Sequence, residues 1–253
     1  MRIIVNADDC GYSEEVNADI EKCIQSHKIT STTILSNMND FDGAISLYNK
    51  YSSYISFGIH LNLTEGTPLT FSQDLLNYGF YKRKESSIVF NGAVFRYKYI
   101  PKTISSAIEN ELESQIKKLL EANVQISHID SHHHIHTAFS IYPIVVKLAK
   151  RYNINKIRTL RNFPRKNLLD SALRNLWKTY AAYNEIRLNY QLLKTNYFSS
   201  VEEFYMSKNI LNKNCTVELM CHPGGIYKSE EIILQSIDSI SGFGGSPINY
   251  NQL

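Results

Sequence analysis

Short apolar runs alternate with segments of helical periodicity along most of the chain, and this alternation limits the fold more than any other feature. The runs are rich in Ile, Val, Leu and Phe. Such alternation is typical of a parallel sheet whose strands are joined by crossover helices. We therefore expect an α/β fold. The expected strands lie at about residues 2–8, 31–38, 57–64, 125–131, 156–160 and 216–221.

Five longer segments are expected to be helices. Between residues 103 and 123 the apolar side chains recur every three or four positions, which is the period of an amphipathic helix. Ser13 and Asp40 stand where helix N-caps are expected, and Pro143 is tolerated in a first helical turn. The expected helices lie at about residues 13–28, 40–51, 103–123, 141–152 and 167–195.

Residues 66 to 100 interrupt the alternation with Gly, Pro and a short hairpin expected around Val89 to Gly92. Loops of this length in a compact domain are often functional, so we expect an insertion over the mouth of an active site. The chain has 253 residues and shows no internal repeat or linker. Because barrels of about 250 residues commonly form one domain, we expect a single domain over residues 1–253.

Charge and hydropathy exclude several classes of partner. The net charge of +3 is small and evenly spread, whereas nucleic-acid binding needs a clustered basic patch. No run approaches the roughly 20 apolar residues that span a bilayer. Met1 and Arg2 lead directly into an apolar strand, and the four cysteines lack the spacing of a disulfide framework. We expect a cytoplasmic protein with no membrane or nucleic-acid partner. The chain could form a homo-oligomer.

A cluster of histidines follows one of the expected strands. Residues 129 to 136 contain Asp130 and four of the eight histidines of the chain. Neutral imidazole is a common ligand of divalent metal ions, and a carboxylate is its usual partner. The cluster therefore predicts a metal-dependent enzyme. His133, His134 and His136 could equally form a solvated turn or lie behind the ligands.

Polar groups also lie at the C-terminal ends of three other expected strands, where parallel α/β folds place their active sites. The four groups lie at residues 6–9, 60–62, 128–136 and 221–225. Because successive side chains of a strand face opposite sides, His60 falls on a polar face, and Asp130 and His132 share one face. Asp8 and Asp9 would point apart on an ideal strand. One could thus reach a metal ion while the other stays free to accept a proton, although helix capping is an equally good explanation of the pair alone.

Five motifs in the order NADDCG, TSTTILSNM, GIHLNLT, HIDSHHHIH and CHPGG resemble the YdjC-like carbohydrate deacetylases, the group that includes chitooligosaccharide deacetylase. The resemblance covers most of residues 1 to 228. It implies an irregular (β/α) barrel related to polysaccharide deacetylases. It also implies a hydrolase that removes acetyl groups from N-acetylated amino sugars or short oligosaccharides with one divalent metal ion, Zn²⁺ or Mg²⁺.

By position, the resemblance implies metal ligands at Asp9, His60 and His132. It implies Asp8 as the catalytic base and offers His222 as the acid, with docking of the Pro223 turn as an alternative role for that histidine. The chain departs from the family pattern at two places: Cys10 replaces the usual aromatic residue, and the segment after Gly225 is shorter than in the family. The second departure makes the last barrel element uncertain.

Two further residues are candidates for orienting the site. Asp130 could orient a ligating histidine, as carboxylates behind metal ligands commonly do. Arg158 could pair with Asp8 and hold its charge, or it could be a purely structural ion-pair partner. Arg161 or Arg165 could contact the substrate instead.

Two other functions are compatible with these residues. A different metal-assisted hydrolase, such as a phosphoesterase or an amidohydrolase, would often use two ions about 4 Å apart, and the extra histidines leave room for a second ion. A catalytically idle sugar-binding protein would explain the shortened C-terminal region. For the deacetylase and for the idle sugar-binding protein, the expected partner is a small carbohydrate.

Overall fold

The fold is taken from a computed structural model, which describes residues 1–92, 100–163, 168–207, 214–225 and 227–253. Parallel strands form a curled sheet in the order β6-β3-β2-β1-β8-β7, and β9 also pairs with β1. The strands are β1 (Arg2–Cys10), β2 (Ser31–Ile34), β3 (Ser56–Leu61), β6 (Ile129–Ser131), β7 (Tyr197–Ser200), β8 (Thr216–Cys221) and β9 (Ser246–Pro247). The architecture is a half-barrel with flanking helices, which confirms the expected α/β class.

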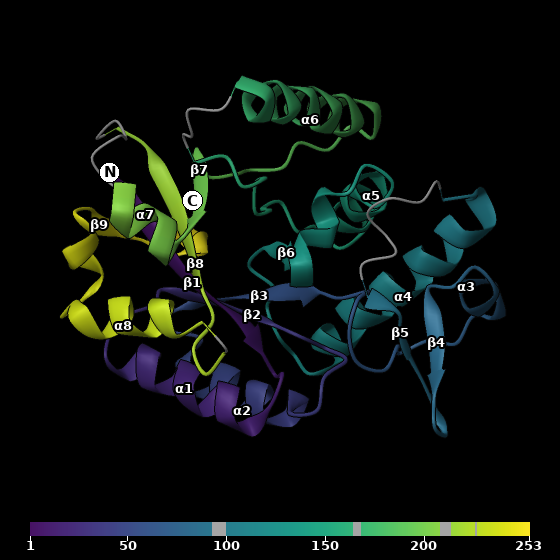
Figure 1. The fold of residues 1–253 in the computed structure, drawn as a ribbon, viewed down its shortest axis with the longest axis horizontal. Coiled ribbons are helices and arrows are strands. Elements are labelled where there is room, and N and C mark those ends of the chain that lie inside the picture. The colour runs from purple at the N-terminus through teal and green to yellow at the C-terminus, as the bar shows by residue number, and fades with distance from the viewer. Residues whose placement is uncertain (93–99, 164–167, 208–213, 226) are drawn as a thin grey trace.

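Helices cover the outside of this sheet. Figure 1 shows α1 and α2 side by side along one side of the strands, with α6 on the opposite side of the molecule. The α-helices are α1 (Glu14–Gln25), α2 (Phe41–Tyr51), α3 (Gln73–Asn77), α4 (Lys102–Glu121), α5 (Tyr142–Arg151), α6 (Leu168–Arg187), α7 (Val201–Ser207) and α8 (Lys228–Ser236). Within the described part of the chain, every helix is too short or too polar to cross a bilayer.

The capping predictions are confirmed. The Ser13 side chain accepts a hydrogen bond from the backbone of Val16, and Asp40 accepts one from Gly43. These bonds satisfy amide groups that have no partner inside the first helical turn. Both helices therefore begin directly after the loops that leave β1 and β2.

Two expected elements differ in the structure. Residues 156–160 form only isolated bridges, at Lys156 and Ile157, and not a strand. The expected helix to residue 195 ends at Arg187, and the unexpected strand β7 follows it at Tyr197–Ser200. Backbone bonds at Ile157 and Asn162 connect this irregular segment to Leu193 and Phe198, so the segment stays at the barrel wall without regular pairing.

The insertion lies beside the barrel more than above it. Its hairpin joins β4 (Tyr81–Lys84) to β5 (Ser87–Phe90), so it begins earlier than expected and includes only the first two residues of the stretch Val89 to Gly92. The hairpin and α3 lie next to α4 in Figure 1. Of residues 66–92, only Gly92 lines the cavity described below. Residues 93–99 lie outside the described part of the insertion.

The end of the chain completes the sheet next to the N-terminus. Strand β9 pairs with β1, and the 3₁₀ turns η4 (Ile240–Phe243) and η5 (Tyr250–Gln252) flank it. Residues 246–252 thus supply a two-residue strand and a final turn. A third 3₁₀ segment, η2 (His132–Thr137), carries the histidine cluster directly after β6.

Candidate active site

A cavity of about 690 Å³ opens at the carboxyl ends of the central strands. Its walls come from the ends of β1, β3 and β8 and from η2. Five of the predicted site residues line it: Asp8, Asp9, His60, His132 and His222. The other two, Asp130 and Arg158, are completely buried against residues of this wall.

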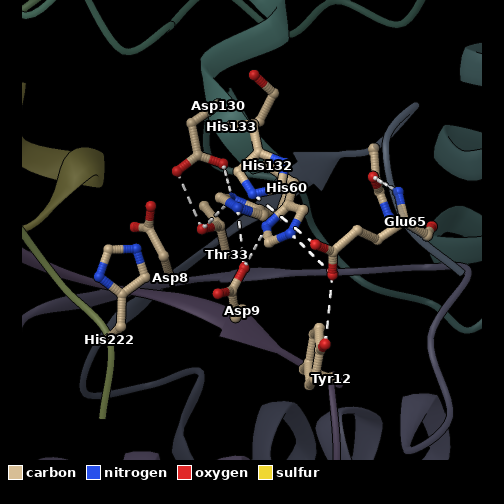
Figure 2. Close-up of polar contacts among 12 residues, drawn as sticks. Asp8, Asp9, Tyr12, Thr33, His60, Glu65, Asp130, His132, His133 and His222 are labelled. Carbon is tan, nitrogen blue, oxygen red and sulfur yellow. Dashed lines mark hydrogen bonds and ion pairs between the residues drawn. The ribbon is translucent and has the colours of Figure 1, made fainter. Parts of the chain in front are cut away.

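Asp9, His60 and His132 converge at one point of the wall (Figure 2). The Asp9 Oδ1 atom lies 3.2 Å from His60 Nε2 and 2.8 Å from His132 Nδ1. Asp9 has a φ of 68°, and the pairing of β1 with β2 is irregular between Ala7 and Cys10. This local irregularity breaks the alternation of an ideal strand. The Asp9 side chain therefore turns toward the histidines, while the Asp8 side chain keeps the direction expected from the regular part of β1.

Asp130 fixes the ring of His60. The two residues are direct neighbours in the pairing of β3 with β6, and Asp130 Oδ1 lies 2.7 Å from His60 Nδ1. Burial alone would lower the pKa of His60, but the charge and hydrogen bond of Asp130 raise it to about 10. With Nδ1 occupied in this way, Nε2 is the ring atom that faces Asp9.

The remaining histidines of the cluster point in different directions. His133 and His134 have φ values of 52° and 55°, which turn the backbone sharply after His132. His133 Nδ1 lies 2.9 Å from the hydroxyl of Thr64, at the cavity wall. His136 is completely buried, with its ring between Ser131 and the Arg158 carbonyl, so a solvated turn does not describe this residue.

Asp8 lies at the buried wall of the cavity and binds Arg158. Two hydrogen bonds of 2.7 Å join its carboxylate oxygens to Nη1 and Nη2 of Arg158, and Asn6 donates a third at 2.8 Å. Burial raises the pKa of Asp8, but the Arg158 charge and hydrogen bonds outweigh it and hold the pKa well below its usual value. Asp8 is therefore ionised at neutral pH.

Arg158 connects this network to two other carboxylates. Its Nη2 lies 2.8 Å from Asp130 Oδ2, and its Nε donates to Glu218 Oε1 at 2.7 Å. The guanidinium also lies over the ring of Phe198, 4.7 Å from its centroid. Arg158 thus pairs with Asp8 as the sequence suggested, and it contacts the residue that orients His60.

His222 forms a dyad with a glutamate that the sequence analysis missed. Glu230 Oε2 lies 3.0 Å from His222 Nδ1 and accepts the backbone N–H of His222 at 2.9 Å. Burial lowers the pKa of His222, but the hydrogen bond and charge of Glu230 produce a net increase. Glu230 is in the first turn of α8, and its position soon after the CHPGG motif was the only local signal of this role.

The donor atoms of Asp9, His60 and His132 fit a divalent cation. One ligand atom from each residue lies within 4.8 Å of the others, and the buried His132 Nε2 atom has only an ion-pair contact of 3.5 Å, with Glu65 Oε2. Two imidazoles with one carboxylate are a common ligand set for transition-metal ions. Burial raises the pKa of Asp9, but hydrogen bonds from His132 and His60 hold it well below its usual value.

Two other groups have suitable ligand atoms in the described residues. Asp8, His60 and Asp130 form one, but the Arg158 guanidinium already binds both of its carboxylates. Glu65, His132 and His133 form the other, at the cavity rim, with His nitrogens 3.5 Å and 3.9 Å from Glu65. Tyr12 also donates to Glu65, at 3.3 Å.

The alternative substrate-binding residues are only partly placed. Arg161 lines the cavity and binds Glu203 and Ser200 through its guanidinium. Arg165 lies outside the described residues. Arg161 therefore remains a candidate for a contact with a substrate in this cavity.

A family model and two relatives match nearly the whole chain. The family model described as YdjC-like protein matches residues 2–242. A carbohydrate deacetylase of Clostridium beijerinckii is 32% identical over 242 residues, which are 93% of this chain and 86% of that protein. A carbohydrate deacetylase of Halalkalibacterium halodurans is 30% identical over 248 residues, covering 96% of this chain and 92% of that protein.

A solved structure has the same fold. The crystal structure of a putative cellobiose-phosphate cleavage protein from Enterococcus faecalis V583 superposes with a TM-score of 0.71. The match covers 99% of this chain and 98% of that one, at 20% sequence identity. At this identity the likeness concerns the fold, and it extends from the first strand to the last turn.

Proposed function

The chain belongs to the YdjC-like family, and on that premise we propose that it is a carbohydrate deacetylase that depends on a divalent metal ion. Its substrate would be a small N-acetylated amino sugar or oligosaccharide. One observation carries the proposal: Asp9, His60 and His132 converge beside an ionised Asp8 that is bound to Arg158 and not to the histidines. In metal-assisted hydrolysis of an amide, a carboxylate that does not bind the cation can accept the proton of the attacking water.

In this proposal Asp9, His60 and His132 hold the ion, with Asp130 fixing the ring of His60. A bound divalent ion polarises the acetamide carbonyl and makes water more acidic. Zn²⁺ suits two nitrogens and one oxygen, and Mg²⁺ is the second candidate.

The other residues would move protons. Asp8 accepts the proton of the attacking water, because it is ionised and lines the cavity next to the three ligands. His222 donates a proton to the departing amine, and Glu230 keeps the imidazole protonated for this step. Amine departure requires that proton, since an amide anion is a poor leaving group. Arg158 holds the Asp8 carboxylate in one orientation through two bonds.

Release of acetate from N-acetylated chitooligosaccharides tests the function. The purified protein is stripped of metal with a chelator, and Zn²⁺, Mg²⁺, Mn²⁺ or Co²⁺ is then added to separate samples. We expect acetate release that depends on added metal. Sugar binding without acetate release under every condition would instead identify a catalytically idle binding protein.

A two-ion hydrolase is the second candidate function. The group Glu65, His132 and His133 favours it, because this group shares His132 with the first site and has ligand atoms close enough for a cation. Metal analysis of the loaded protein separates the two schemes. One tightly bound ion per chain supports the deacetylase scheme, and two would support the alternative.

A further inference from the structure

Tyr250 lies under the active site although it is only three residues from the end of the chain. It is completely buried, and its ring stacks on His128 with centroids 3.5 Å apart and an interplanar angle of 8°. Its backbone N–H donates to the hydroxyl of Ser56 at 3.1 Å. Just before it, β9 pairs with β1, and the backbone N–H of Ile248 donates to Ile3. The ring is thus held by contacts that do not need its hydroxyl group.

The hydroxyl of Tyr250 has a separate partner, Glu218. It donates to Glu218 Oε2 at 2.5 Å, and Glu218 Oε1 accepts from Arg158 Nε at 2.7 Å. Glu218 is completely buried on β8, so each carboxylate oxygen has one donor and no access to water. A continuous chain of hydrogen bonds therefore runs from Tyr250 through Glu218 and Arg158 to Asp8.

We propose that Tyr250 is a positioning residue of the active site, which acts through Glu218 to hold the Arg158 guanidinium in the orientation that fixes Asp8. This inference rests on the proposed function, in which Asp8 is the base. Tyr250 does not line the active-site cavity, and its role is confined to the orientation of groups that do.

The geometry of the guanidinium explains the effect. A guanidinium is planar and presents its donors in a fixed fork, so fixing Nε also fixes the directions of both Nη atoms. Those atoms bind Asp8 and Asp130 at the same time, at 2.7 Å and 2.8 Å. Without the Tyr250 hydroxyl, Glu218 Oε2 would be a buried carboxylate oxygen with no donor, which is costly. Protonation or rotation of Glu218 would then break its hydrogen bond to Arg158 Nε and allow the guanidinium to rotate.

The chain contains a matched control for this hydrogen bond. Tyr142 on α5 donates to Glu185 on α6, also at 2.5 Å, and both residues are buried. Neither residue lines the cavity, and the ion-pair partner of Glu185 is Lys194. Tyr142→Phe and Tyr250→Phe each remove one buried tyrosine–glutamate hydrogen bond and keep the ring, so they separate a role in the site from a role in the fold.

The experiment measures kcat, KM and Zn²⁺ affinity of both variants on an N-acetylated chitooligosaccharide. We expect Tyr250→Phe to lower kcat by about tenfold, which is the loss that removal of one buried hydrogen bond can cause, with KM and Zn²⁺ affinity within about twofold of wild type. Tyr142→Phe should leave kcat unchanged. Equal kcat losses in both variants, or an unchanged kcat in Tyr250→Phe, would overturn the inference.

A double-mutant cycle tests the path through Glu218. Glu218→Gln should itself lower kcat, and Tyr250→Phe should then cause little further loss, because residues that act through one chain of contacts are not additive. Fully additive losses would refute the path. If wild type releases no acetate, the proposed function fails, and crystal structures decide the inference separately. Unchanged Arg158–Asp8 hydrogen bonds in Tyr250→Phe would then overturn it.

Discussion

Asp8 and Asp9 are consecutive residues, yet their carboxylates have different direct partners: Asp8 binds Arg158, and Asp9 contacts His60 and His132. The positive φ of Asp9 produces this separation at the end of β1. A pair of neighbouring carboxylates can therefore take two roles, one as a ligand and one as a base. The first two predictions test these roles separately.

Asp8→Asn should abolish most turnover and leave metal binding intact. The amide cannot accept the proton of water, and general-base catalysis typically contributes about 10²- to 10⁴-fold. The measurement is kcat for acetate release together with the metal content of the purified variant. Asp9→Asn is the contrasting variant, because it should lose both metal and turnover. Near-normal turnover of Asp8→Asn would show that another group is the base.

His60→Ala and His132→Ala should each lower metal occupancy. Both imidazoles face Asp9, so each deletion removes one of three donors. His133→Ala is the matched control, since its side chain is half exposed and its Nδ1 faces Thr64. Calorimetric titration with Zn²⁺ measures the affinity of each variant. If His133→Ala lost as much affinity as the other two, the rim group with Glu65 would be the better assignment.

Glu230→Gln should move the basic limb of the kcat profile to lower pH. The Glu230 carboxylate raises the pKa of His222 against the effect of burial, and an acid works only while it is protonated. Removal of the negative charge lowers that pKa, so activity should disappear at a lower pH than in wild type. The neighbouring exposed Glu231 provides the control, because Glu231→Gln should leave the profile unchanged. A basic limb that does not move in Glu230→Gln would exclude His222 as the acid.

Local patterns in the sequence were sufficient for the central strands. The apolar runs that became β1, β3 and β8 are long enough to show their periodicity, and polar residues follow each of them directly. Strand β7 has only four residues, two of them serines, and it is a strand because Tyr197 to Ser200 pair with β8. Such pairing depends on a partner distant in sequence, so the local pattern of apolar residues does not predict this strand.

Some residues of the candidate site could likewise be predicted from the sequence, and others could not. His60 lies within one predicted strand and His132 directly follows another, so their proximity could be predicted from strand alternation and the shared edge of the sheet. Glu218 and Tyr250 reach the site through contacts 60 and 32 residues away along the chain, to Arg158 and to each other. These contacts depend on where the chain end returns to the sheet, which the residue types alone do not specify.

The buried histidine His136 makes the fold sensitive to acid. The Arg158 carbonyl can only accept, so Nε2 of the neutral ring carries the proton and Nδ1 accepts from the Ser131 hydroxyl. The oxygen of that hydroxyl also accepts the backbone N–H of His136. Both ring nitrogens are thus satisfied in the neutral form. Burial, together with the Arg158 charge, lowers the pKa of His136 from 6.5 to about 3. Between these two values the unfolded chain binds a proton that the folded chain does not.

His136 therefore contributes stability above pH 6.5 that is lost progressively as the pH falls toward about 3. Its share of the loss is about 1.4 kcal/mol of unfolding free energy per pH unit. His136→Gln should show a shallower decrease than wild type between pH 6.5 and 4.5 in urea denaturation, whatever its stability at neutral pH. His27→Gln, at an exposed site, should keep the wild-type slope. Equal slopes in all three proteins would mean that His136 is not the group that titrates on unfolding.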